Sequence, residues 1–400
     1  MRVHLLYPTA FHGWLDLIVE SDRTNEKSWN DALQNAGING TIFQSTFWAE
    51  YARKIHGDHP IYLSSTDKKG NIIGLLLALQ SCYGDYPAFN WGDSLSMRGF
   101  FIRKLYKAAL KSVFERMLPF IQWQNGPVVL QQSMPENHSP DRTYRDLIER
   151  ILRIAEETKC YAIQFARPPY FMDRAEIMFS YGFEKERMGT ILVDVGQPVE
   201  SMWESIDRKN RHGIKKAEQD ITFAEVTKLV ELQDFYSVYV QSTKRQGAKP
   251  YPFSHFESMW DFFSPMDKIA AFIAFFRDKP VAANVSLMHN SMMHLYAVAD
   301  SDFARSSKIC ANDSLWWHVL KWAHDRGFSY FDMSGSFFDK IDAGDKKAYS
   351  LYKFKSKWGG KDVEFNDYRK SVDQSAFRVR SKSARILNPF LREGEGCHTY

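Results

Sequence analysis

The sequence is poor in cysteine, with four cysteines among 400 residues. They stand far apart and none belongs to a CxxC pair, which argues against a zinc site and against a disulfide framework. Because proteins of oxidising compartments commonly keep disulfides, this usage favours a reducing compartment and a cytoplasmic location. The four are Cys82, Cys160, Cys310 and Cys397.

Long hydrophobic runs are also lacking. No stretch approaches the roughly 18 consecutive apolar residues that a membrane helix needs. The first 20 residues make a poor signal peptide, because His, Pro, Gly and Asp interrupt their apolar part. We therefore expect a cytoplasmic protein that could work at a membrane surface but not within the bilayer.

Motifs that identify nucleotide, metal and hydrolytic enzymes are absent. The sequence holds neither GxGxxG nor GxxxxGKS/T, so neither a Rossmann cofactor nor a P-loop nucleotide is indicated. HExxH and the GxSxG elbow of hydrolases are lacking too. His56 and His59 lie three residues apart, but no third ligand stands nearby, and such loop histidines are most often simply exposed. We expect neither a metal nor a bound cofactor.

The composition is that of a soluble globular protein with many aromatic residues. Hydrophobic residues make up 44%, charged residues 25% and aromatic residues 15% of the chain. So many aromatics favour large packed cores and lined pockets over disorder. The formal charge of +4 is too small to indicate nucleic-acid binding, so such a role would have to come from local clusters of basic residues.

The chain predicts the same order of elements twice. Residues 45–80 predict a helix capped within the Ser45–Thr46 pair and then a β-hairpin, and residues 255–298 predict an aromatic helix followed by three strands. Residues 146–165 and 314–333 each predict a helix that runs through a polar turn into a strand, with identical spacing of the apolar positions. A shared helical period could be coincidence, but the matching order favours a duplicated α/β unit with mixed sheets flanked by helices.

The boundary between the two halves is expected near Gly196 and Pro198, which break the preceding strand ILVDV. The first domain is then residues 1–195 and the second residues 196–361. Beyond Gly360 the segment VEFNDY alternates like another strand.

Two segments combine basic and aromatic residues. The first, SMWESIDRKNRHGIKKAEQ (201–219), predicts a helix on which Arg208, Arg211 and Lys215 share one face. Taken alone, such a face is most often simply solvated. Its expected buried stripe consists of Trp203, Ile206, Ile214 and Ala217.

The second segment, AYSLYKFKSKWGGK (348–361), predicts a helix that closes on a glycine pair. Lys353 and Lys357 lie away from its apolar stripe, whereas Lys355 flanks the stripe and should send its ammonium out at a rim. A lysine emerging from an aromatic surface, beside glycines that let backbone come close, suits an anionic ligand, and the aromatics offer a base something to stack on. The stripe consists of Leu351, Phe354 and Trp358.

These segments resemble the Fem aminoacyltransferases, which build peptidoglycan interpeptide bridges from aminoacyl-tRNA. The resemblance spans roughly residues 40 to 365. It implies two GNAT-like domains, with residues 362–400 returning to complete the first, and an armless type, because residues 224–265 are too short and aromatic for the helical arm of some members. Its motifs are FQSTFWAEY (43–51), NGPVV (125–129), SMWESIDRKNRHGIKKAEQD (201–220), SYFDMSGS (329–336) and LYKFKSKWGG (351–360).

The resemblance also implies a site and its partners. Lys355, with Phe354 beside it, matches the catalytic lysine at the pocket for the tRNA end. Asp332 is a candidate acid or base, although an Asp before a turn is more often a structural cap. The expected partners are the acceptor end of aminoacyl-tRNA and a peptide or muropeptide precursor, with membrane association through a lipid-linked substrate. The groups expected to bind the donor and its phosphates are Arg211, Lys215, Lys216, Lys353 and Lys308.

Two other interpretations remain open. An acyl-CoA donor would need a Q/RxxGxG/A loop at a helix start. The corresponding segment RSSKIC (305–310) has Lys308 and Cys310 where glycines would be needed, which disfavours acyl-CoA. The chain could also be a non-catalytic RNA- or envelope-associated binding protein that has kept the fold.

Overall fold

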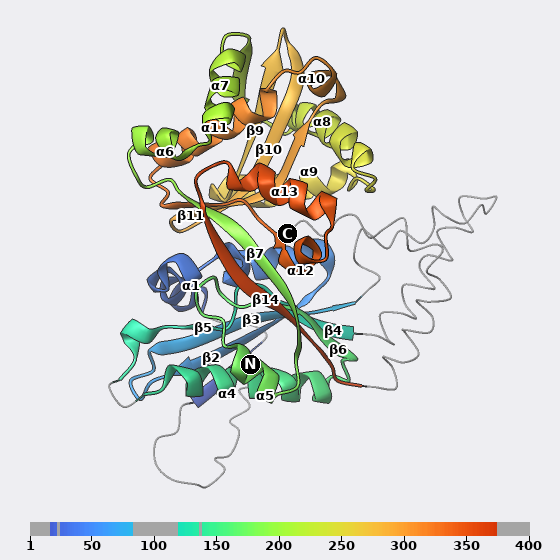
Figure 1. The fold of residues 1–400 in the computed structure, drawn as a ribbon. Helices are drawn as coiled ribbons and strands as arrows, with labels where there is room; N and C mark the ends of the chain where they lie inside the picture. Colours follow the sequence, from blue (N-terminus) through green and yellow to red (C-terminus); the bar gives the residue numbers. More distant parts are fainter. Residues whose placement is uncertain (1–16, 22–24, 83–118, 136–137, 374–400) are drawn as a thin grey trace, which may run out of the picture. The chain divides into compact units, whose positions relative to one another are not determined.

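The structure is a computed structural model, and it describes residues 17–21, 25–82, 119–135 and 138–373 (Figure 1). Contacts between residues divide the chain into two compact units. Of the described residues, unit 1 holds those up to residue 186 and residues 365–373, and unit 2 holds residues 187–364.

Two long strands, β7 (Glu184–Asp194) and β14 (Lys361–Ser371), each begin in one unit and end in the other. The sequence placed the boundary after residue 195 and the return of the chain after residue 361. The structure divides the chain after residues 186 and 364 instead, so each division falls within a strand, the first in β7 and the second in β14. Gly196 follows the end of β7 and does not separate the units.

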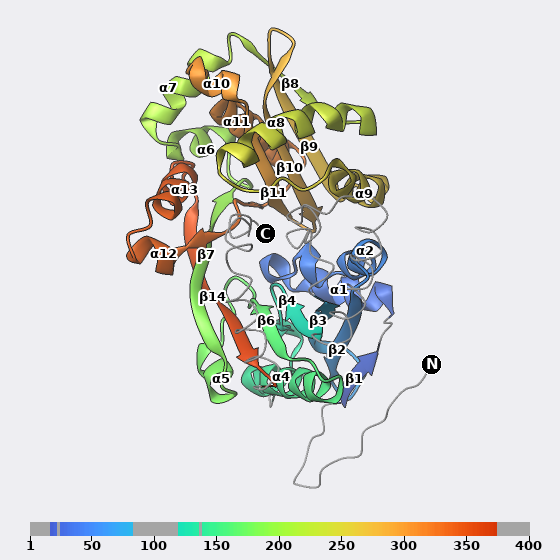
Figure 2. The same ribbon diagram turned by 90° about the vertical axis from the view of Figure 1, so that its right-hand side faces the viewer.

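Unit 1 is a sheet with helices on both faces. The described strands follow the order β1-β2-β3-β4-β6-β14, and among them β4 and β6 run parallel. In Figure 2, α4 and α5 lie on one side of this sheet and α1 and α2 on the other. The elements are β1 (Leu17–Ser21), α1 (Glu26–Asn35), α2 (Thr46–Tyr51), β2 (His59–Thr66), β3 (Ile72–Cys82), β4 (Pro119–Trp123), β5 (Val128–Val129), α4 (Pro140–Glu157), β6 (Ala162–Ala166) and α5 (Ala175–Ser180).

Unit 2 has the same layered plan. Its described strands follow the order β7-β12-β11-β10-β9-β8, with β13 paired to β7. Figure 1 shows α6, α7 and α11 on one side of the sheet and α8 and α9 on the other. The elements are α6 (Val199–Ser205), α7 (Arg208–Ala217), β8 (Ile221–Glu225), α8 (Leu232–Arg245), α9 (Phe253–Phe263), β9 (Ile269–Phe276), β10 (Lys279–His289), β11 (Met292–Asp300), α10 (Asp302–Ser306), α11 (Ala311–Asp325), β12 (Tyr330–Asp332), β13 (Ser336–Phe337), α12 (Phe338–Asp342) and α13 (Lys346–Ser356).

The predicted repeat is confirmed in both units. Helix α2 precedes the hairpin β2–β3, and Ser45 caps α2 by accepting a hydrogen bond from the backbone N of Trp48. Helix α9 precedes the hairpin β9–β10. The pairs α4–β6 and α11–β12 complete each copy.

Each unit has its own hydrophobic core, which the helix of the repeat covers with its apolar stripe. In unit 1 the buried side chains of α4 pack with those of β2, β3, β4 and β6. In unit 2 those of α11 pack with β9, β10, β11 and β12, together with the fully buried Trp358 after α13. The stripe of α4 consists of Leu147, Ile148, Ile151 and Ala155, and that of α11 of Leu315, Trp316, Val319, Leu320 and Ala323.

The helix expected over residues 201–219 is two helices, so that prediction was wrong. Ile206 is extended, with φ −70° and ψ 140°, and this ends α6. The carboxylate of Asp207 then caps α7 by accepting hydrogen bonds from the backbone N of Lys209 and Asn210. Trp203, expected in the buried stripe, is only partly buried.

No helix in the part of the chain that the structure describes is both long enough and apolar enough to cross a membrane.

Candidate active site

Lys355 is buried near the end of α13, and backbone carbonyls hold its ammonium. The Nζ atom donates to the carbonyl oxygens of Ser334, at 2.7 Å, and Gly335, at 2.6 Å. The residue is 5% exposed. The sequence placed this ammonium at a rim, whereas the structure turns it inward toward the turn that follows β12.

The surroundings of Lys355 lower its pKa but leave it cationic at neutral pH. Burial lowers its pKa from 10.5 to about 8, while the negative charge of Asp332 acts in the opposite direction. At neutral pH the ammonium therefore still prevails. An ammonium has three N–H donors, of which the two carbonyls take two. The third N–H has no acceptor among the described residues.

The turn that holds Lys355 is organised by Asp332, the last residue of β12. Its Oδ1 accepts hydrogen bonds from the backbone N of Ser334, at 2.8 Å, and from the hydroxyl of Thr190 on β7. Its Oδ2 lies 3.2 Å from Nδ1 of His294 on β11. The cap expected as the alternative role of Asp332 is therefore present, since the carboxylate binds the backbone two residues on.

Sequence reasoning missed Thr190 and His294, and it did not show that the carbonyls of Ser334 and Gly335 accept hydrogen bonds from Lys355. A histidine inside the apolar strand MMHLYAVA and an Asp before the Ser-Gly pair of SYFDMSGS were the available signals. They could not show that these residues meet, because that depends on the register of three strands.

The site lies where β11 and β12 stop pairing. Their parallel register ends with the pair His294–Asp332, and among the described strands the rest of β11, up to Asp300, pairs with β10 alone. The β10–β11 register shifts between Val285 and Ser286, within this same part of β11.

The two basic segments meet inside unit 2. The backbone N of Asp207, which caps α7, donates to the carbonyl of Lys357 at 3.0 Å. A Cβ on Gly359 would lie 2.5 Å from the Cβ of Ser205 at the end of α6, and one on Gly360 would lie 2.8 Å from the carbonyl oxygen of Leu192. The glycine pair, interpreted from the sequence as room for a ligand, instead lets α13 pack against α6 and β7.

Lys353, on α13, and Lys357, directly after this helix, lie in different environments. Lys353 is exposed, with its ammonium 5.8 Å from the ring centre of Tyr349. Lys357 forms a 2.6 Å ion pair with Asp313 in the first turn of α11, and its ammonium lies 4.3 Å from the ring centre of Phe354. Phe354 is partly buried against the unit 2 core, next to Lys355 in the sequence.

The basic face of α7 is largely exposed. Arg211 is partly buried and directs its guanidinium to the carbonyl oxygens of Trp203, at 3.4 Å, and Glu204, at 3.5 Å, at the end of α6. Lys215 and Lys216 are exposed, and the ammonium of Lys215 lies 5.6 Å from the ring centre of Trp203. Lys215 and Lys216 are thus accessible to an anion.

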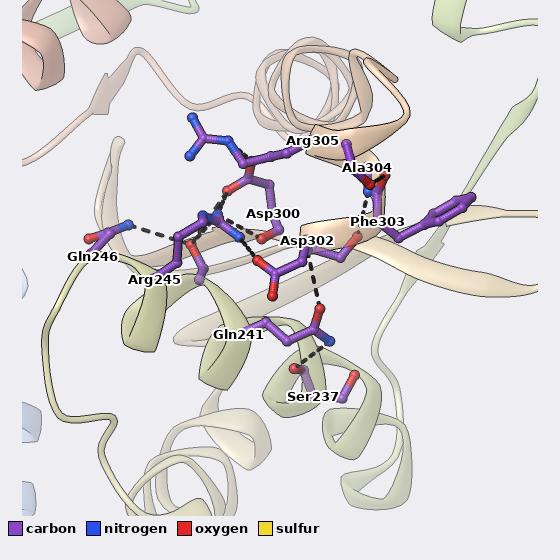
Figure 3. Close-up of polar contacts among 12 residues, drawn as sticks. Ser237, Gln241, Arg245, Gln246, Asp300, Asp302, Phe303, Ala304 and Arg305 are labelled. Carbon is purple, nitrogen blue, oxygen red and sulfur yellow. Dashed lines mark hydrogen bonds and ion pairs between the residues drawn. The ribbon is translucent and has the colours of Figure 1, made fainter.

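The loop between β11 and α11 carries Lys308, which is exposed and has φ +54°. Ion pairs between side chains hold the start of this loop. The guanidinium of Arg245, at the end of α8, binds the carboxylates of Asp300 and Asp302 (Figure 3). Arg305 adds a contact to Asp300 at 3.5 Å. This network fixes the point at which the loop leaves the sheet.

Cys310, at the start of α11, is exposed and free, and Cys160 in unit 1 is free and buried. Gly213 of α7 packs against Cys310: a Cβ there would lie 3.1 Å from the sulfur. The side chain of Cys82 and all of Cys397 lie outside the described residues. Within the described ranges no group of three or more His, Cys, Asp or Glu side chains is arranged to hold a metal ion.

Comparison with known proteins supports the architecture. A model described as an acetyltransferase (GNAT) domain matches residues 203–355, which include Lys355, Asp332 and α7. No curated protein matches the sequence.

The solved structures that are similar over most of the chain include the following three. FemX superposes with a TM-score of 0.64 at 15% identity, covering 90% of this chain and 99% of FemX. The C-terminal domain of a protein from Agrobacterium fabrum assigned as a lysylphosphatidylglycerol synthetase gives a TM-score of 0.50 at 11% identity, covering 95% and 99%. A tandem GNAT protein from the clavulanic acid biosynthesis pathway gives 0.50 at 5% identity, covering 87% and 96%.

At such low identity these likenesses concern the fold, and the domain model adds support for an acyltransferase. The chain therefore has the α/β fold of two GNAT-like domains, and its second unit carries a match to the acetyltransferase (GNAT) domain family.

Proposed function

We propose that the protein is an aminoacyltransferase of the armless Fem-like type. It transfers an amino acid from aminoacyl-tRNA to an amine of a peptidoglycan precursor or a similar peptide. The observation that carries the proposal is the buried ammonium of Lys355, held by the carbonyls of Ser334 and Gly335 in the turn that follows β12. The aminoacyl-tRNA is a co-substrate, and no metal or bound cofactor takes part.

The chemistry explains why such an ammonium is useful. An amine attacks the ester carbonyl of the donor, a tetrahedral oxyanion forms, and the ribose hydroxyl leaves. The remaining N–H of Lys355 donates to the oxyanion or to the terminal phosphate of the tRNA. A preorganised charge at a low-dielectric site contributes about 3 kcal/mol to such a step. Phe354, which precedes this lysine on α13, is partly buried against the unit 2 core.

The attacking amine must lose a proton, because an alkyl ammonium has a reference pKa near 10.4. The carboxylate of Asp332 already binds Thr190 and the backbone of Ser334. We therefore assign Asp332 a structural part and leave the amine proton to a group of the substrate.

The donor's phosphates are bound by exposed cations of unit 2. Lys215 and Lys216 lie on α7, Lys353 on α13 and Lys308 on the loop before α11, while Arg211 supports α6. Contacts of this kind release counterions, so donor binding should weaken with salt. The proposed setting is the cytoplasm, with a lipid-linked acceptor bringing the enzyme to the membrane surface.

A specific observation favours a second candidate, an acyl-CoA-dependent N-acyltransferase. Lys308 has the positive φ that glycine adopts most readily, in the loop that leads into α11. Glycine would adopt this φ without strain, as the loop of an acyl-CoA enzyme requires, and Cys310 caps α11 without a side-chain hydrogen bond. A non-catalytic RNA- or envelope-associated binder is the third candidate.

One experiment separates the three. The protein is incubated with labelled aminoacyl-tRNA or labelled acetyl-CoA and a lysine-containing muropeptide precursor, with and without ribonuclease, and products are identified by mass spectrometry. Ribonuclease-sensitive transfer supports the proposal, and ribonuclease-insensitive transfer from acetyl-CoA supports the second candidate. No transfer in any arm supports a binder. Lys355→Met should slow transfer at least about 100-fold, whereas Lys346→Met, at an exposed position of the same helix, should leave the rate unchanged.

A further inference from the structure

Thr190, Asp332 and His294 form a buried polar row across three adjacent strands, β7, β12 and β11. They are 2%, 7% and 2% exposed. Asp332 lies opposite His294 on one side and Leu192 on the other, two residues from Thr190, so all three side chains share one face of the sheet. Buried polar groups are costly unless they bind one another, so this row needs a reason.

The row ends at a strained turn. Ser334 has φ +62°, a conformation that a residue with a Cβ rarely adopts. Its backbone N donates to Oδ1 of Asp332 at 2.8 Å, which stabilises this conformation. In the same conformation the carbonyls of Ser334 and Gly335 both point at the ammonium of Lys355.

We propose that Thr190, Asp332 and His294 are positioning residues that hold the Ser334–Gly335 turn in the shape that binds the ammonium of Lys355. This inference rests on the part that the proposed function gives to Lys355. Thr190 and His294 fix the carboxylate of Asp332, the carboxylate fixes the turn, and the turn's carbonyls fix the lysine. None of the three needs to touch the substrate.

The competing interpretation makes Asp332 the base that takes the proton of the amine. The geometry favours positioning, since the carboxylate already accepts hydrogen bonds from Thr190 and Ser334 and lies against His294. The two roles respond differently to Ser334→Gly. Glycine adopts a positive φ without help from the carboxylate, so it can restore a turn but not a missing base.

The test therefore uses Asp332→Ala alone and together with Ser334→Gly, in the full-length protein. Two quantities are measured: the acetylation rate of each lysine by an N-hydroxysuccinimide ester, followed by mass spectrometry, and transfer from aminoacyl-tRNA. The exposed Lys353 is the internal reference for labelling.

We expect Lys355 in the wild type to react at least about tenfold more slowly than Lys353, because its ammonium is buried and bound. Asp332→Ala should raise the labelling of Lys355 about tenfold and lower the transfer rate by a similar factor, the change expected from losing a hydrogen bond to a charged group. Adding Ser334→Gly should recover part of both. Thr190→Val replaces threonine with a side chain of nearly the same shape, and it should also raise the labelling of Lys355 and lower the transfer rate. It provides the test if Asp332→Ala does not fold.

Unchanged labelling of Lys355 in Asp332→Ala, or in Thr190→Val in its place, would overturn the proposal. A fall in transfer without a change in labelling, which Ser334→Gly does not rescue, would instead identify Asp332 as the base. Labelling that responds as expected, in a protein that transfers from no donor, would leave the positioning role standing and reject the proposed function.

Discussion

Replacing Gly359 with alanine should destabilise the protein far more than a typical glycine substitution. Gly359 has φ +73°, and a Cβ there would lie 2.3 Å from the Oγ, 2.5 Å from the Cβ and 2.8 Å from the carbonyl oxygen of Ser205. Real Cβ atoms do not approach other atoms so closely, and one of the three is backbone. The end of α13 would therefore have to move away from the end of α6.

The magnitude follows from two costs. A left-handed conformation costs a residue with a Cβ about 1–2 kcal/mol. Overpacking a close contact adds about 1–3 kcal/mol. We expect the free energy of unfolding to fall by about 3 kcal/mol, measured by urea denaturation monitored by tryptophan fluorescence.

Gly344 provides a matched control. It also has a positive φ, +82°, but a Cβ on it would meet no atom within 4 Å. Gly344→Ala should therefore cost only the conformational part, about 1 kcal/mol. Ser205→Gly in the Gly359→Ala background should recover part of the loss, because it removes two of the three clashing atoms. Equal losses in the two alanine variants would refute the contact between α6 and α13.

Three further predictions concern charges in unit 2. The difference in unfolding free energy between Lys355→Met and the wild type should change by about 3 kcal/mol between pH 7 and pH 10.5, measured by denaturation at each pH. The sign follows from the pKa of Lys355, which is lowered to about 8 in the folded protein. Below pH 8 the folded wild type is destabilised by its buried ammonium, and this cost disappears as the pH rises, so the stability of Lys355→Met relative to the wild type should be greatest at low pH. A pH-independent difference would contradict this burial. Arg245→Met leaves the partly buried Asp300 with only the longer contact from Arg305, so it should cost about 2 kcal/mol and speed proteolysis of the loop before α11. Unchanged cleavage would show that the network does not hold the loop. The Lys357–Asp313 pair should give a coupling of about 1 kcal/mol in a double-mutant cycle with methionine and asparagine, decreasing in high salt, and zero coupling would argue against the pair.

The sequence predicted the elements of the repeat well because their signals are local. The apolar spacing of α4 and α11 indicates a helix whatever surrounds it, and Ser45 is a cap residue directly before an apolar stripe. The division into units was less predictable. Gly196 breaks a strand, and nothing local shows that β7 and β14 each belong to both units.

The candidate site was predictable only in part. The helical spacing drew attention to Lys355, but its burial depends on carbonyl acceptors about 20 residues earlier in the chain. The same limit hid Thr190 and His294, which meet Asp332 through strand register. Asp207 is a residue type that commonly caps helices, but the apolar residues at helical spacing on both sides of it suggested one continuous helix.

The transfer rate of Lys355→Met in a single turnover tests the central claim most directly. Purified protein in excess is mixed with labelled aminoacyl-tRNA and a lysine-containing peptide acceptor, and Lys346→Met is run alongside. We predict that Lys355→Met slows transfer at least about 100-fold and that Lys346→Met transfers at the wild-type rate. Transfer by the wild type should be lost completely after ribonuclease treatment. Transfer by Lys355→Met at the wild-type rate would contradict the account.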